Sequence, residues 1–333
     1  MKLLLLILLT FYGAGCSQIN DQNSVQLVLE NAVSNKFDGM IVYVDRGYDS
    51  KLYSAGWKNR EDEIPADPFS LFKIASISKL YIAAATAKIV SEGSLSIDKT
   101  LSEYLPDLDG RIENAETITL KMMLQHRSGI PNFTDEEYNY PWGETPKSIR
   151  KTLELVLNMP ADFKPNKKYK YSNTNYLLIG EILDRTLGYS HHQYIKEEIL
   201  IPLELNDTYS LLSEINLDDL TSGYHVGWEM DVKQNDYIIP GGSMIATIKD
   251  VGIFLRALID GSLLDNKEQA IYSSIYKYEH TGLLPGYHSI ARYQKDIDAV
   301  VILFINTSGN SWSKTESIYK KIVKAINKGG LTV

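Results

Sequence analysis

The chain has 333 residues, of which 44% are apolar and 23% are charged. This composition is enough for one large core or two modest ones, and it argues against a disordered chain. The net charge of −8 argues against nucleic acid as a partner, because binding to phosphate backbones needs positive charge. The acidity of the whole chain also gives no attraction to an anionic membrane surface.

The first residues have the pattern of a secretory leader. Lys2 is followed by a short apolar run, and small residues precede Cys16, which is the only cysteine, so no intramolecular disulfide can form. The stretch 1–16 resembles a bacterial lipoprotein signal, in which the cysteine becomes the lipidated N-terminus. Cleavage after Gly15 as an ordinary signal peptide is the alternative. In either case we expect export to the periplasm, or anchoring to the outer membrane through Cys16, with polar residues 17–24 as a tether.

The next part of the chain predicts a helix, two strands and a second helix. Residues 25–34 have a helical apolar pattern, 39–47 are typical of a buried strand ending in a turn, and 51–57 are its expected hairpin partner. Residues 74–92 are apolar on most helical faces, which predicts a buried helix that ends at Gly93.

Helices and loops interrupted by prolines are expected from there to about residue 265, including a helix over 174–187. The chain then returns to strands at 288–294 and 299–305, and it ends in an amphipathic helix over 313–327. No later apolar run is long enough to span a bilayer.

Strands at both ends with helices between them indicate one sheet-bearing part interrupted by a helical part. The predicted division places 25–75 and 266–333 in the sheet-bearing part and 76–265 in the mainly helical part.

The first candidate motif for chemistry is Ser-x-x-Lys, formed by Ser76 and Lys79. The same pattern occurs seven times in the chain, so the motif alone carries little weight. Ser76 is favoured because it lies where a loop enters the predicted buried helix. Side chains at i and i+3 share a helix face, and a helix N-terminus favours negative charge developing nearby.

A lysine near a serine can serve as its general base only if it loses its proton. The ordinary lysine pKa is about 10.4, so burial must lower it by roughly 3 units, which costs about 4 kcal/mol. The apolar helix provides a suitable setting for Lys79. The alternative is a surface Ser76 and Lys79 on an ordinary first turn.

The second motif, Tyr171-Ser172-Asn173, is the only Tyr-x-Asn among 22 tyrosines. Tyr171 could pass a proton to the leaving group if its pKa is lowered, and Asn173 could bind a substrate carbonyl and hold Lys79. The alternative is a turn tyrosine followed by an asparagine that caps the helix 174–187.

The third motif is His280-Thr281-Gly282. A strand ending in glycine would let a substrate backbone lie alongside as an added strand. The amide of Leu283 could pair with that of Ser76 as an oxyanion hole, where each donor stabilises by roughly 2.7–4 kcal/mol. The alternative is the entry of a hairpin with a partly exposed histidine.

In this order, the three motifs resemble the signatures of the penicillin-recognising serine hydrolases, which include class C β-lactamases, D-alanyl-D-alanine peptidases and related esterases. The resemblance covers nearly the whole mature chain. It implies a β-lactamase/transpeptidase-like α+β fold, with an antiparallel sheet flanked by terminal helices, a helical domain beside it and the site between them. Further stretches similar to this family are 72–79, 124–131, 202–205, and 241–247 with Asp250.

The resemblance implies an acyl-enzyme on Ser76, with Lys79 and Tyr171 moving protons and no metal or cofactor. Further residues are expected to orient the substrate, namely Asn173, His280 and Thr281. The substrate is expected to be a small molecule or peptide, and we expect a D-alanyl-D-alanine-type peptidase or an esterase rather than an efficient β-lactamase. A catalytically silent envelope protein that binds peptidoglycan or a partner is the alternative.

Three departures from the family pattern bear on the substrate. His280 replaces the lysine of true β-lactamases, Asn166 stands where a glycine is usual before the tyrosine motif, and 264–279 is shorter than in most relatives. The aromatic and acidic loop 132–142 either borders the cleft and helps to choose the substrate or is a surface loop.

Other candidate sites are weaker. No Gly-x-Ser-x-Gly elbow is present, which disfavours an α/β-hydrolase. His191-His192 has no partner at metal-ligand spacing, so a loop or helix surface is expected there. His126 and His288 are expected to be structural.

Overall fold

The computed structural model describes residues 24–144, 148–309 and 312–329. The predicted leader with Cys16, and all of the predicted tether except Ser24, lie outside these ranges. Ser24 is the N-cap of the first helix, where its side chain accepts a hydrogen bond from the Leu27 amide. Within the described ranges no helix has the length and apolar character needed to cross a membrane.

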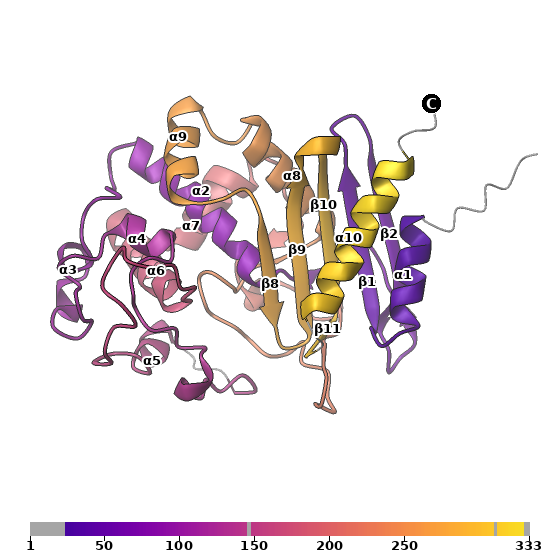
Figure 1. Cartoon of the computed structure of the whole chain (residues 1–333), viewed down its shortest axis with the longest axis horizontal. Coiled ribbons are helices and arrows are strands. Elements are labelled where there is room, and N and C mark those ends of the chain that lie inside the picture. Colours follow the sequence, from indigo (N-terminus) through magenta and orange to yellow (C-terminus); the bar gives the residue numbers. More distant parts are fainter. Residues whose placement is uncertain (1–23, 145–147, 310–311, 330–333) are drawn as a thin grey trace, which may run out of the picture.

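The centre of the structure is an antiparallel sheet in the order β3-β2-β1-β10-β9-β8 (Figure 1). Strands from the two ends of the chain meet in its middle, where Met40 of β1 lies opposite Ile305 of β10. Every residue of these two strands is buried, which explains why their sequences are nearly continuous apolar runs. The strands are β1 (Gly39–Asp45), β2 (Ser50–Asn59), β3 (Ile64–Pro65), β8 (His280–Leu284), β9 (Tyr287–Gln294) and β10 (Ala299–Ile305).

Helices cover both faces of the sheet. The terminal helices α1 (Val25–Val33) and α10 (Trp312–Gly329) pack together on one face, over the core cluster that includes Val42 and Leu303. On the other face α8 (Ile248–Asp260) contacts β1, β9 and β10. The antiparallel sheet flanked by terminal helices, as the resemblance implies, is therefore confirmed.

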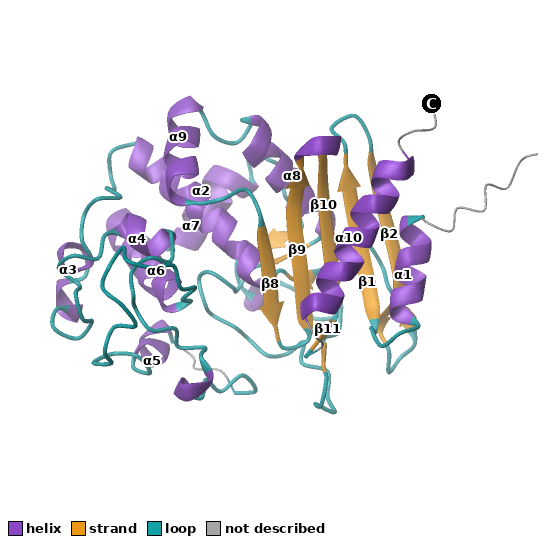
Figure 2. Cartoon of the chain, viewed as in Figure 1, coloured by secondary structure: helices purple, strands orange, loops and turns teal. Residues whose placement is uncertain are grey.

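The remaining helices gather beside the sheet around α2 (Ser78–Ser91), as Figure 2 shows. Helix α2 contacts α6 (Thr174–Leu187), α7 (His191–Ile195) and α9 (Asn266–Ile275). The other short elements are α3 (Leu101–Tyr104), α4 (Leu120–Leu124), α5 (Ile149–Leu153), β4 (Phe72–Lys73), β5 (Thr208–Tyr209), β6 (Tyr224–His225), β7 (Ile245–Ala246) and β11 (Thr307–Ser308).

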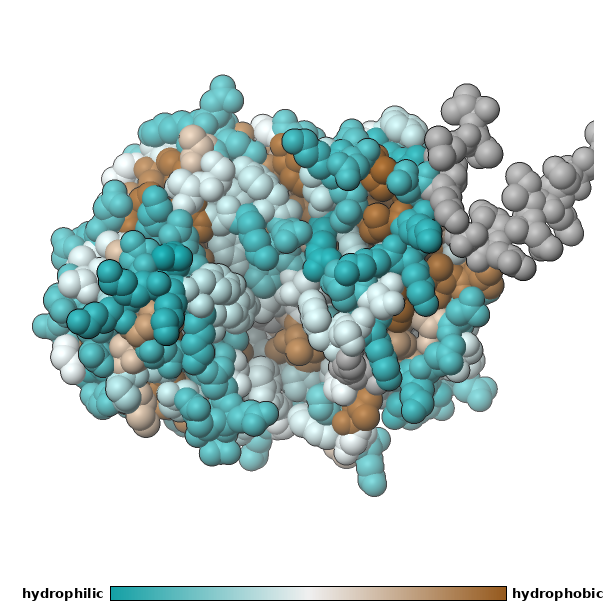
Figure 3. Space-filling model, in the orientation of Figure 1, coloured by the Kyte–Doolittle hydropathy of each residue, from teal (hydrophilic) through white to brown (hydrophobic). Residues whose placement is uncertain are grey.

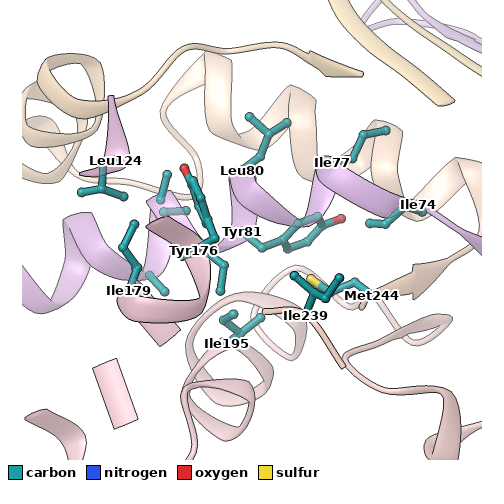
Figure 4. Packing of buried hydrophobic residues seen from close by; sticks show 14 of the residues in the cluster. Ile74, Ile77, Leu80, Tyr81, Leu124, Tyr176, Ile179, Ile195, Ile239 and Met244 are labelled. Atoms are coloured by element: carbon teal, nitrogen blue, oxygen red, sulfur yellow. The ribbon is translucent and has the colours of Figure 1, made fainter. Parts of the chain in front are cut away.

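Helix α2 is the buried helix that its sequence predicts. All residues from Ser78 to Ala87 are buried, so the helix has no solvent-facing side over this stretch. Figure 4 shows Ile77 and Leu80 on one side of the helix and Tyr81 on the other. Tyr81 stacks on Phe254 of α8 with a centroid distance of 3.6 Å, which joins the helical part to the helix that covers the sheet.

The expectation for the paired histidines is wrong for His191, which is buried in α7 and does not lie on a surface. Its Nδ1 lies 2.7 Å from Asp184 Oδ1, and its backbone amide donates to the same oxygen. This pair joins α6 to α7. In the described part of the chain no group of three metal-ligating side chains is placed to hold an ion.

Candidate active site

Ser76 lies in a 3₁₀ turn, Ala75–Ile77, between β4 and α2. Helix α2 itself begins at Ser78, later than the sequence predicts. Ala75 has φ of +53°, a left-handed conformation that is unfavourable for alanine. Two hydrogen bonds hold the turn, because Ser78 Oγ donates to the Ala75 carbonyl at 2.6 Å and Ser289 Oγ donates to the Ile74 carbonyl at 3.0 Å. The neighbouring structure therefore fixes the conformation of the turn that carries Ser76.

Lys79 is fully buried, and its ammonium group faces the serine. Its Nζ lies 3.0 Å from Ser76 Oγ, 3.0 Å from Asn173 Oδ1 and 2.7 Å from the Gly241 carbonyl. Burial lowers the pKa of Lys79 to about 7, and no carboxylate offsets this effect. A lysine in this state is about half deprotonated at pH 7, so it can accept a proton. Its contact with Gly241 could not be assigned from the sequence, although the surrounding segment resembles the family.

Tyr171 approaches Ser76 from the other side. Its hydroxyl donates a hydrogen bond to Ser76 Oγ at 2.9 Å. Burial raises the pKa of Tyr171, so the expectation of a lowered pKa is wrong, and the phenol is neutral. A neutral phenol in this position is a proton donor and not a base.

His126 supports Tyr171 from behind. The two rings stack with a centroid distance of 4.3 Å, and His126 Nδ1 accepts a hydrogen bond from the Ser172 amide at 3.2 Å. Burial and the nearby Lys79 lower the pKa of His126 to about 3, so the imidazole stays neutral and can accept this bond. His126 therefore positions the tyrosine motif through packing and one hydrogen bond.

Asn173 stands at the N-cap of α6, but its side chain makes no capping bond. Its Oδ1 faces Lys79 and its Nδ2 donates to Thr134 Oγ1 at 3.1 Å. Its backbone amide donates to Asn132 Oδ1 at 2.8 Å. The alternative reading of a capping asparagine is therefore wrong, and the loop that begins at 132 holds Asn173 toward the lysine.

The third motif begins an edge strand. Strand β8 starts at His280 and continues past Gly282 to Leu284, so the expectation of a strand that ends at the glycine is wrong. A Cβ atom at Gly282 would lie 2.4 Å from the Ile74 carbonyl oxygen and 2.2 Å from Ser289 Oγ. Only a glycine lets β8 lie directly against the residues that precede Ser76. Leu283 follows at once, in register with His288.

Replacing Gly282 with alanine should displace β8 from the Ser76 turn, because the new methyl group would overlap a backbone oxygen. We expect a loss of about 1–3 kcal/mol in the free energy of unfolding, together with a large loss of hydrolysis. Gly143 has open space around its Cβ position and a negative φ, so Gly143→Ala is the control. Equal melting temperatures for the two variants would contradict this account of Gly282.

His280 is buried, with 6% of its surface exposed, so the reading of a partly exposed histidine is wrong. Its ring lies parallel to that of Tyr276 at 5.9 Å, and its Nδ1 donates to the Thr281 carbonyl. This bond leaves Nε2 as an acceptor. Burial, followed by the charge of Lys79, lowers the pKa of His280 far below its ordinary value. His280 therefore cannot supply the positive charge of the lysine that it replaces.

Asn166 has the backbone conformation that the usual glycine would provide. Its φ is +62°, in the left-handed region that asparagine tolerates better than most residues. Arg127 donates to its side chain at 2.7 Å and to its carbonyl at 2.6 Å. Asn166 thus adopts a left-handed backbone conformation that glycine would also allow.

These side chains line a cavity of about 710 Å³ between the helical part and the sheet. Figure 3 shows pale and apolar side chains along this boundary, whereas hydrophilic ones cover much of the remaining face. The lining residues include Ser76, Tyr171, Asn173, His280, Thr281 and Leu283.

The loop 132–142 does border the cavity, through Asn132, Thr134 and Trp142. Its other aromatic residues do not line the cavity, because Phe133 and Tyr140 belong to the core and Tyr138 packs against it. None of its acidic residues lines the cavity, and Asp135 pairs with Lys170 at 3.0 Å.

Comparisons with known proteins agree with this geometry. A family model described as Beta-lactamase matches residues 25–274. The chain is 24% identical over 225 residues to Penicillin-binding protein 4* of Bacillus subtilis (strain 168), covering 66% of this chain and 48% of that protein. It is 24% identical over 316 residues to the Putative penicillin-binding protein PbpX of the same strain, covering 88% and 76%. The chain thus spans less than half of the first relative and about three quarters of the second.

Solved structures show the same fold. D-amino acid amidase from Ochrobactrum anthropi SV3, complexed with L-phenylalanine amide, superposes with a TM-score of 0.81 at 22% identity, covering 93% of this chain and 99% of that one. EstCE1, a hydrolase with promiscuous acyltransferase activity, superposes with a TM-score of 0.73 at 18% identity, covering 91% and 99%.

Proposed function

Because the chain belongs to the Beta-lactamase family, we propose that it is a serine hydrolase that forms an acyl-enzyme on Ser76. The observation that carries this proposal is the pair of contacts to Ser76 Oγ, with Lys79 Nζ at 3.0 Å and the Tyr171 hydroxyl at 2.9 Å. A serine activated by an adjacent base is the usual arrangement for nucleophilic catalysis.

In the proposed acylation, Ser76 Oγ attacks the substrate carbonyl and gives its proton to neutral Lys79. The amides of Ser76 and Leu283 stabilise the negative charge that develops on the carbonyl oxygen. Tyr171 is protonated before this step, and it donates its proton to the leaving group as the bond to the acyl carbon breaks. The proton that Lys79 took from Ser76 then passes to the Tyr171 phenolate, which restores both Lys79 and Tyr171 to their neutral forms.

Deacylation repeats these steps with water. Water attacks the acyl carbon, the bond to Ser76 Oγ breaks, and the serine regains a proton, which leaves the acid as product. Asn173 holds Lys79 in place during both steps, because its Oδ1 is bonded to Nζ.

We propose D-alanyl-D-alanine-type peptides or esters as substrates, and not β-lactams. The support is His280, which is neutral where β-lactamases have a lysine. A histidine at this position resembles the D-peptidase and esterase branches of the family, and not true β-lactamases. The imidazole itself offers a substrate carboxylate no ionic partner, so we expect an ester to be a better substrate than a peptide that ends in a carboxylate.

A panel of D-alanyl-D-alanine peptides, p-nitrophenyl esters and nitrocefin tests this substrate class on the purified protein. We expect kcat/KM for the best ester or peptide to exceed that for nitrocefin by at least about tenfold, which corresponds to about 1.4 kcal/mol in the transition state. Nitrocefin as the best substrate would contradict the proposal. His280→Lys should reduce the difference in kcat/KM between the best substrate and nitrocefin, because it places a cation at this position.

A further inference from the structure

Three of the four tryptophans in the chain line the catalytic cavity. They come from three separate segments: Trp142 from the loop after Tyr140, Trp228 from the loop after β6, and Trp312 from the start of α10. The fourth, Trp57, lies on β2 and does not line this cavity. Tryptophan has a large apolar ring with a polar N–H group and is enriched at binding interfaces, so three indoles around one cavity favour a binding role.

The tryptophans that lie nearest the sheet remain open to solvent. Trp228 is 39% exposed and Trp312 is 43% exposed. Each is nevertheless held by a neighbouring ring, His225 for Trp228 at 4.8 Å and His288 for Trp312 at 4.7 Å. His225 is itself held by Ser308, whose Oγ lies 2.7 Å from its Nδ1. These rings orient the indoles while leaving their surfaces free for a ligand.

Trp142 lines the cavity from the loop 132–142 and is also held by neighbouring rings. Its ring packs edge-to-face on Tyr140 at 4.8 Å and on Tyr237 at 6.0 Å. Its carbonyl accepts a hydrogen bond from Asn235 Nδ2 at 3.4 Å. The cavity therefore has indole surfaces on both the helical side and the sheet side.

The lining is also free of charge. Among the described residues that line the cavity there is no aspartate, glutamate, lysine or arginine. Burial lowers the pKa of each lining histidine, to about 4 for His288 and well below the ordinary value for His280, with a smaller decrease for His225. A carboxylate or an ammonium group placed among the tryptophans would lose hydration without gaining an ionic partner from the lining, which is costly.

A second cavity indicates which part of the substrate, acyl group or leaving group, lies among the tryptophans. It has a volume of about 340 Å³, shares Tyr171, His280 and Thr281 with the first, and also contains Lys277. Because Tyr171 donates to the leaving group in the proposed mechanism, the leaving group departs toward this shared wall. The part of the substrate that lies among the tryptophans is therefore the acyl part.

We propose that the site is selective for an uncharged aromatic acyl group, carried as an ester or amide, whose ring lies among Trp142, Trp228 and Trp312. This inference rests on the proposed function and narrows its substrate class. In the reaction the ester or amide bond breaks, the acyl carbon bonds to Ser76 Oγ, and the serine proton leaves with the alcohol or amine. Water then releases the aromatic acid and restores the serine.

Boronic acids, which form reversible tetrahedral adducts with a nucleophilic serine, test acyl selectivity directly. We would measure inhibition constants for phenylboronic, 4-carboxyphenylboronic and methylboronic acid. We expect phenylboronic acid to bind at least about tenfold more tightly than methylboronic acid. The added carboxylate should weaken binding by about tenfold or more.

Variants test which tryptophans produce the preference for an aromatic group. Trp228→Ala and Trp312→Ala should each reduce the preference for phenylboronic over methylboronic acid several-fold, whereas Trp57→Ala should leave it unchanged. Labelling of Ser76 by a fluorophosphonate, read by mass spectrometry, reports the proposed function separately. Equal affinities for the three boronic acids in a protein that is still labelled would overturn this inference alone. A protein that neither is labelled nor binds any boronic acid would overturn the proposed function, and this inference with it.

Discussion

Replacing Ser76 with alanine should abolish labelling by a fluorophosphonate and lower ester hydrolysis by on the order of 10⁴-fold or more. Without Oγ no acyl-enzyme can form, and Lys79 and Tyr171 lose the atom that both of them contact. Mass spectrometry of the intact protein measures the labelling, and hydrolysis of a p-nitrophenyl ester measures the rate.

The chain provides its own control for this substitution. Ser96 stands in another Ser-x-x-Lys pattern, with Lys99, but it is exposed and lies in the loop between α2 and α3. Ser96→Ala should keep both labelling and activity. Labelling that persists in Ser76→Ala would refute this serine as the nucleophile, and a wild-type protein that is never labelled would support the silent binding protein.

The value of kcat/KM should rise with pH and level off above an apparent pKa of about 7. Lys79 must be neutral to accept the serine proton, and burial lowers its pKa to about 7, so the active fraction grows as pH increases through that value. Lys79→Arg keeps the positive charge but cannot lose its proton in this range. It should therefore lower kcat/KM by about 10²–10⁴-fold between pH 6 and 9.

The same shift predicts an effect on stability. Between about pH 7 and the ordinary lysine pKa, the unfolded chain holds a proton on residue 79 that the folded chain has lost, so stability rises with pH in this window. Lys73, whose pKa burial also lowers to about 7, contributes a rise of the same sign. Lys79→Met should remove the contribution of residue 79 to this rise in the free energy of unfolding, and it should also abolish activity.

The role of Lys79 as the base can be refuted by kinetics. A flat pH–rate profile between pH 6 and 8, or an active Lys79→Arg variant, would show that Lys79 is not the base.

Much of the fold follows from local patterns in the sequence. The continuous apolar run 299–305 is the buried strand β10, and the helix that is apolar on most faces is the buried α2. The predicted burial of this helix distinguishes Ser76 from the other six serines with the same motif. The structure places Lys79 in contact with Ser76. Strong periodicity and strong burial are properties that a single segment reveals.

The rest of the site depends on contacts between distant segments. The role of Asn173 is set by Thr134 and Asn132, which no spacing rule connects to it. The raised pKa of Tyr171 comes from burial by the surrounding chain, and sequence offers no measure of that burial. Trp228 and Trp312 line the same cavity because β6 pairs with β11, which lies a few residues before the start of α10.

The pairing of β1 with β10 also constrains how the molecule can fold. Met40 and Ile305 are neighbours across the sheet although more than 250 residues separate them along the chain. Bringing them together carries a loop-closure cost in entropy, and folds dominated by such distant pairs form slowly. The β1–β2 hairpin gains its central neighbour only after residues 299–305 have been synthesised. We therefore expect the sheet to close only after residue 305 has been synthesised, and a chain truncated before 299 to leave one edge of the apolar strand β1 unpaired and prone to aggregate.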